Sequence, residues 1–85
     1  MKSTATERVI DVESIEILMA LFGNFDENIK LIEKETGVKV VARETQIRMT
    51  GKKQEVVLAD KIIKKLIEIL ENRERLDTAK VAYTI

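Results

Sequence analysis

A long amphipathic helix in the second half of the chain constrains its fold most. Apolar residues recur at helical spacing from about Lys53 to Glu71: Val56, Val57, Ala59, Ile62, Ile63, Leu66, Ile67 and Leu70. Such a helix is stable in water only when other elements cover its apolar stripe. Because 85 residues can build only one hydrophobic core, this pattern predicts a single domain organised around the helix.

The segments that could cover this helix are short and follow a strand pattern. Residues 8–12 and 46–50 alternate between apolar and polar side chains, and Val38–Ala42 is rich in β-branched residues. The polar residues 43–45 predict a hairpin between the last two of these segments. We therefore predict an α+β fold, in which helices pack on one face of a three-stranded sheet.

Two short helices with a glycine break lie between the first two predicted strands. Ser14 is a suitable N-cap for the first helix, whose apolar stripe is Ile15, Leu18, Met19 and Phe22. Gly23-Asn24 ends this helix, and Asp26 is placed to cap a second helix over about Glu27–Thr36 with its carboxylate. Gly37 follows, where a left-handed cap residue is favoured. The predicted order is β-α-α-β-β-α.

The two ends of the chain have weaker patterns. We interpret residues 1–7 as a flexible leader, because they are small and polar, and we place the domain at residues 8–72. Residues 73–77 are charged, and residues 80–85 alternate, which is typical of a short strand or a linker. We therefore predict that residues 73–85 form a C-terminal tail or a linker.

Composition excludes several classes of function. The chain has no cysteine and no histidine, which removes disulfides, thiolate nucleophiles and the usual zinc ligands. We predict no catalytic residue, no metal site and no enzyme activity for this chain. No segment approaches the roughly 20 apolar residues of a membrane span and none resembles a signal peptide, so we expect a cytoplasmic protein without membrane contact. Fifteen basic residues balance fifteen acidic ones, so a nucleic-acid partner would need a local basic patch.

The middle of the sequence resembles a type I KH domain. The pattern is Gly23-x-x-x-x-Asn28-Ile29-Lys30-x-Ile32-Glu33-x-Glu35-Thr36-Gly37-Val38-x-Val40, with a second match at Thr50-Gly51 followed by Val57, Ala59 and Ile62. In KH domains these features are a GxxG loop between two helices, a hairpin, and a turn into the last helix. The resemblance covers roughly Arg8 to Leu70 and implies a KH-like fold and an RNA-binding module.

A narrower likeness is to the N-terminal segment of PhoH-like (phosphate starvation-inducible) proteins, a bacterial family with a P-loop ATPase domain. It rests on residues 20–30, on Gly37–Val40 and on Arg43. The chain lacks the G-x-x-x-x-G-K-[ST] motif, so ATP and Mg²⁺ are expected only for an absent ATPase domain, and no cofactor is expected here. The likeness implies an excised accessory domain, with a stand-alone copy as the alternative.

The resemblance implies candidate nucleic-acid-binding residues at the turn and at nearby basic positions: Gly23, Asn24, Phe25, Lys30, Lys34, Lys39 and Arg43. A KH loop lets its backbone approach a phosphate through two glycines. Here the second glycine is replaced by Asp26, a degenerate loop whose carboxylate opposes a phosphate. Acidic residues are also interleaved with the basic ones, a pattern more typical of a solvated face.

The identity of the partner stays open at this stage. Phe25 could stack on a base, anchor a protein partner or fold back onto the second helix. The expected partners are single-stranded RNA and the chain's own ATPase domain, with a second copy of the chain as a further one. The alternative to RNA binding is a protein–protein interaction or oligomerisation module of the ATPase.

Overall fold

The computed structural model describes residues 5–72 and 78–85. The elements in order are β1 (Thr6–Asp11), α1 (Ile15–Phe22), the 3₁₀ turn η1 (Asn24–Asp26), α2 (Glu27–Thr36), β2 (Lys39–Arg43), β3 (Gln46–Gly51), α3 (Lys53–Glu71) and α4 (Thr78–Thr84). The predicted α+β class is confirmed, and α3 occupies the predicted range. None of the helices within the described residues combines the length and hydrophobicity needed to cross a membrane.

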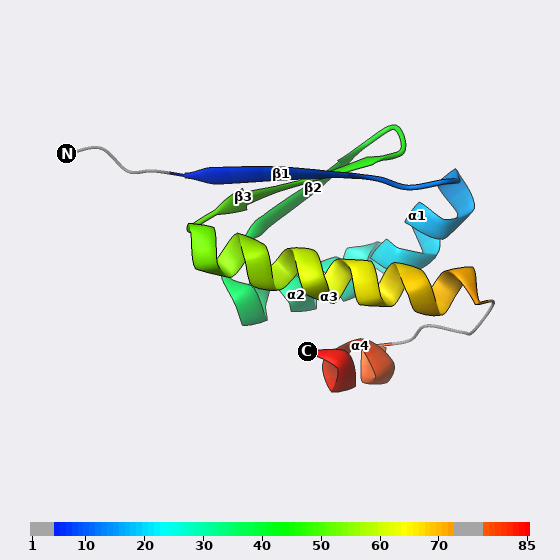
Figure 1. Cartoon of the computed structure of the whole chain (residues 1–85). Coiled ribbons are helices and arrows are strands. Elements are labelled where there is room, and N and C mark those ends of the chain that lie inside the picture. Colours follow the sequence, from blue (N-terminus) through cyan, green and yellow to red (C-terminus); the bar gives the residue numbers. More distant parts are fainter. Residues whose placement is uncertain (1–4, 73–77) are drawn as a thin grey trace.

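The three strands form an antiparallel sheet in the order β1-β3-β2. Ile10 lies opposite Ile47, and Met49 lies opposite Val40, so these side chains share the face that the helices cover. Figure 1 shows all the helices on this one side of the sheet, with α3 running below β1 and β3. Within the described residues, no helix packs on the other face of the sheet.

The core lies between the sheet and the helices. Its largest fully buried apolar side chains are Leu21, Ile32, Val38, Ile47, Met49, Val56, Ile63, Leu66 and Val81. The predicted packing of Met19 is wrong, because α1 turns Leu18 and Leu21 inward and leaves Met19 67% exposed at its edge. Phe22, the last residue of the predicted apolar stripe, is partly buried and packs against the core.

The end of α2 is fixed by Gly37 and Thr36. Gly37 has φ 80° and ψ 7°, and its N–H donates to the carbonyl of Glu33, which confirms the predicted left-handed cap. The buried hydroxyl of Thr36 donates to the carbonyl of Ile32 at 2.7 Å and accepts from the N–H of Val38 at 3.2 Å. Thr36 thus satisfies the backbone where the chain leaves the helix for β2.

Replacing Thr36 with valine, which has nearly the same shape, is expected to lower the free energy of unfolding by about 1–2 kcal/mol, because the buried N–H of Val38 loses its acceptor. Urea denaturation measures this change. Thr84→Val is the matched control, since the Thr84 hydroxyl donates the same kind of bond to the carbonyl of Lys80, and no backbone N–H within the described residues donates to it. Equal losses in the two variants would contradict this role for Thr36.

The carboxyl-terminal segment differs from the prediction. Residues 80–85 do not form a strand or an extended linker, since Thr78–Thr84 is helix α4, which contacts α2 and α3 (Figure 1). Val81 is fully buried while Tyr83 is 92% exposed. Alternation would place both on one face of a strand, but two residues along a helix turn the side chain by about 200°. Residues 73–77 of the predicted tail lie outside the described residues.

The first strand begins earlier than predicted. Thr6 and Glu7, which we assigned to a flexible leader, pair with Gly51 and Thr50 of β3. Strand pairing is made by backbone groups, so it extends beyond the apolar alternation that marks residues 8–12. Residues 1–4 of the predicted leader lie outside the described residues.

Candidate functional site

A pocket opens beside the turn between α1 and α2. It has a volume of about 280 Å³, and its lining residues are Leu18, Met19, Phe22, Gly23, Asp26 and Ala42. The turn thus forms one wall, α1 another, and β2 contributes Ala42. All of these side chains except Asp26 are uncharged, so the pocket offers an apolar surface with one carboxylate at its side.

Gly23 shapes the turn and could not be another residue without strain. Its φ of 80° and ψ of −177° lie in a region that only glycine populates readily. A Cβ atom at this position would lie 2.7 Å from Nδ2 and 2.9 Å from Cγ of Asn28. Asn28 is itself buried, and its Nδ2 donates to the carbonyl of Ala20 at 3.5 Å. Gly23 and Asn28, two residues of the KH-like pattern, therefore form one interlocked contact.

The predicted capping of α2 by Asp26 is wrong. Asp26 has φ 59° and ψ 26°, and its side chain makes no hydrogen bond to the start of α2. An N-cap residue needs an extended backbone for its side chain to reach the free N–H groups, whereas Asp26 is left-handed. Its N–H instead donates to the carbonyl of Gly23 at 3.2 Å. The carboxylate therefore remains exposed beside the pocket.

The turn also leaves polar and aromatic groups open to solvent. Within the described part of the chain, the N–H groups of Asn24 and Phe25 have no hydrogen-bond acceptor. Phe25 is also left-handed, with φ 53°, and its side chain is 93% exposed. The ring therefore does not fold back onto α2, which leaves base stacking and protein anchoring as its possible roles.

The open edge of β2 runs past the pocket. The N–H of Val40 points to this edge, where it donates to Oε2 of Glu33 at 2.8 Å. Because backbone groups on a strand point to alternate sides, the N–H and carbonyl of Ala42 face the same edge. Ala42 therefore brings both an apolar side chain and a hydrogen-bonding edge to the pocket.

The predicted basic residues do not form one groove. Lys39 and Arg43 alternate with Val40, so they lie on the outer face of the sheet, away from the helices. Lys30 and Lys34 are exposed on α2, and Lys30 lies one turn before Glu33, on the side that faces β2. Of the predicted residues, Gly23 lines the pocket, Asn24 and Phe25 follow it in the turn, and Lys30 lies one helical turn after Asp26.

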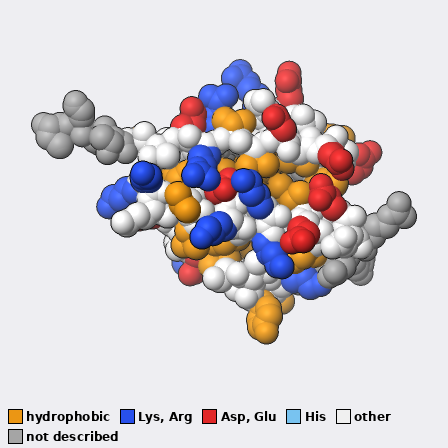
Figure 2. Space-filling view, in the orientation of Figure 1, with side chains coloured by type: hydrophobic (Ala, Val, Ile, Leu, Met, Phe, Trp, Pro, Cys, Tyr) orange, Lys and Arg blue, Asp and Glu red, His pale blue; other side chains and the backbone are white. Residues whose placement is uncertain are grey.

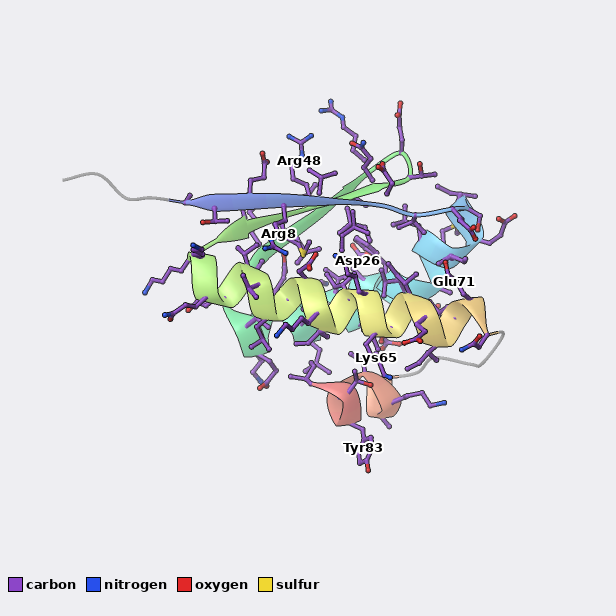
Figure 3. All side chains as sticks on the ribbon, in the orientation of Figure 1. Arg8, Asp26, Arg48, Lys65, Glu71 and Tyr83 are labelled. Carbon is purple, nitrogen blue, oxygen red and sulfur yellow. The ribbon has the colours of Figure 1, made fainter. Side chains whose placement is uncertain are left out.

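Arg48 shares the outer face of the sheet, where its Nη1 lies 3.4 Å from Oε2 of Glu7 (Figure 3). The strand alternation of Val38–Ala42 already implied that Lys39 and residues two apart from it would face outward.

Sequence reasoning missed Ala42 and Met19 as pocket residues. The exposed methionine on α1 carries no sequence signal that separates it from core methionines.

Comparison of the chain with protein-family models, with curated proteins and with solved structures finds no match. Within the described residues, no group of three or more acidic side chains is placed to hold a metal ion. The candidate site is therefore the pocket, the Gly23–Asp26 turn and the open edge of β2.

Proposed function

We propose that this domain binds single-stranded RNA, with a base in the pocket and the sugar-phosphate backbone along the Gly23–Asp26 turn. The observation that carries the proposal is the meeting of three features at one place: an apolar pocket, a glycine turn with unpaired N–H groups, and an open strand edge. The β-α-α-β-β-α order supports the KH-like resemblance, to which α4 is an addition.

Each feature has a distinct role toward an unpaired nucleotide. Apolar walls accept the face of a base, while the N–H and carbonyl of Ala42 can bond to its edge. The N–H groups of Asn24 and Phe25 can donate to a phosphate, and the exposed ring of Phe25 can stack on a neighbouring base. Lys30 adds a positive charge on the adjacent side of α2.

Asp26 opposes this binding, which gives a sharp test. Asp26→Asn removes the negative charge while keeping a residue that tolerates the left-handed backbone. Removing one unfavourable charge beside a phosphate is expected to strengthen binding of labelled single-stranded RNA about five- to tenfold at low salt. Fluorescence anisotropy measures the dissociation constants of both proteins.

The pocket is tested by filling it. Ala42→Leu adds three carbon atoms beside the pocket and is expected to weaken RNA binding about tenfold or more. Val41→Leu is the control, because Val41 points to the outer face of the same strand. If the unmodified domain fails to bind single-stranded RNA at high micromolar concentration, or if Ala42→Leu binds as well as Val41→Leu, the proposal fails.

A second candidate function is docking of a protein segment, for which the supporting observation is the exposed apolar surface beside a carboxylate. Met19 is 67% exposed and Phe25 93% exposed, and both border the turn. Such residues suit an apolar and basic segment, and the likeness to PhoH-like proteins suggests their own ATPase domain as its source. Asp26→Asn separates the two functions, because it would weaken docking of a basic segment while strengthening RNA binding.

A further inference from the structure

The outward side of α3 carries a basic surface that is separate from the pocket. We call the exposed side chains of Arg8, Lys52, Lys53, Lys61 and Lys64 the basic α3 surface. Figure 2 shows Lys and Arg side chains gathered over the start of β1 and the first turns of α3, with acidic side chains toward the other end. α3 packs on β1 and β3, whereas the pocket lies at β2.

A buried carboxylate organises two of these cations. Oδ2 of Asp60 accepts from Nη1 of Arg8 at 3.0 Å and lies 3.2 Å from Nζ of Lys64. The Asp60 side chain is 7% exposed, while those of Arg8 and Lys64 are 44% and 61% exposed. Figure 3 shows Arg8 between β1 and α3. One negative charge thus holds two positive ones in place, and their remaining N–H donors stay available to solvent.

Two further lysines extend the surface along the helix. Lys53 and Lys61 are exposed and make no ion pair within the described residues. At a rise of about 1.5 Å per residue, Lys53 and Lys61 are separated by about 12 Å along α3, and Lys53 and Lys64 by about 16 Å. This distance spans several phosphates of a nucleic-acid duplex, whose strands rise about 3.4 Å per phosphate.

The surface lacks what other polyanionic partners would use. α3 contains no aromatic residue, so its face has no ring on which an unpaired base could stack. An acidic protein would be anchored by buried aromatic or other large side chains at the centre of its interface, whereas lysines surround the half-buried Val57 here. Lysines spaced along one side of a helix suit contacts to phosphates that do not depend on base sequence.

We propose that the basic α3 surface binds the phosphate backbone of a double-stranded nucleic acid without reading its sequence. This site is independent of the pocket and does not rest on the single-stranded RNA proposal. Arg8 and Lys64 form its fixed part, and Lys52, Lys53 and Lys61 make no ion pair within the described residues.

The test compares two double variants of the full chain on a short DNA duplex about two helical turns long. Lys53→Gln/Lys61→Gln removes two unpaired charges from the surface and keeps the Asp60 bonds. Lys34→Gln/Arg43→Gln removes the same charge from α2 and the outer sheet face. Binding is measured by anisotropy between about 50 and 200 mM salt, the range over which phosphate contacts strongly reduce affinity.

For Lys53→Gln/Lys61→Gln, the plot of log affinity against log salt is expected to be shallower by about 1.8, because each phosphate contact contributes about 0.9. Its loss of affinity over this salt range is then about tenfold smaller than that of the unmodified chain. An unchanged slope, or an equal change in Lys34→Gln/Arg43→Gln, would overturn the proposal. So would tighter binding of poly-glutamate or of a single strand through these lysines. Failure of single-stranded RNA to bind the pocket is a separate result, since the RNA experiment uses variants of Asp26, Val41 and Ala42 and not of the basic α3 surface.

Discussion

Replacing Gly23 with alanine is expected to lower the free energy of unfolding by about 3 kcal/mol, since a left-handed or extended positive-φ backbone alone costs a side-chain residue about 1–3 kcal/mol. The added Cβ would also lie 2.7 Å from Nδ2 of the buried Asn28, so the two helices would have to separate. For 85 residues the total stability is about 4–13 kcal/mol, and this loss is a large part of it. Urea denaturation measures the difference.

Gly51→Ala is the matched control for this experiment. Gly51 has no positive φ, and a Cβ there would meet its neighbours at 3.5 Å or more, which is ordinary contact. Adding Asn28→Ala to Gly23→Ala removes the two atoms that the new Cβ would strike, so the double variant should be more stable than the sum of the single changes predicts. If Gly23→Ala and Gly51→Ala are equally stable, the interlocked turn is not the constraint described above.

Replacing Val81 with aspartate is expected to detach α4 and to lower the free energy of unfolding by about 3 kcal/mol, because the change loses a buried side chain and would bury an unpaired charge. Because burying this charge is unfavourable, α4 would detach from α2 and α3 and expose the apolar side chains beneath it. Urea denaturation reports the loss of stability, and binding of a dye specific for exposed apolar surface reports the detachment.

Tyr83→Asp is the control for α4, because it places the same charge on the same helix at a side chain that is 92% exposed and points away from the domain (Figure 3). Its effect is expected to stay within about 0.5 kcal/mol. A similar loss in both variants would mean that aspartate disfavours the helix itself, and that docking of Val81 contributes little.

The parts of this fold that could be predicted from sequence are those governed by local signals. The apolar spacing of α3 gave its range, and Ser14 caps α1 as expected, with its Oγ accepting from the N–H of Ile17 at 3.2 Å. Gly37 takes the left-handed conformation because few other residues do so at low cost. In each case one residue and its near neighbours determine the outcome.

The features that were mispredicted depend on contacts distant in sequence or on a backbone choice that the residue type leaves open. Aspartate is common both as an N-cap and in the left-handed region, so Asp26 alone does not decide between them. α4 is helical where the pattern indicated a short strand or a linker, and it packs against α2 and α3. The sequence analysis did not identify the basic α3 surface, because Arg8 joins it only through the packing of β1 on α3.

The bond between Glu33 and the N–H of Val40 has a consequence for how the domain behaves when it is crowded. The free border of β2 is where another extended chain could add a strand and start aggregation. A second strand would need the N–H of Val40 as a donor. This N–H already donates to Oε2 of Glu33 on α2 at 2.8 Å. The second strand would have to displace the Glu33 carboxylate before it could pair with β2 beyond Ala42. Growth of a fibre from this edge therefore requires that the bond between Glu33 and Val40 break first.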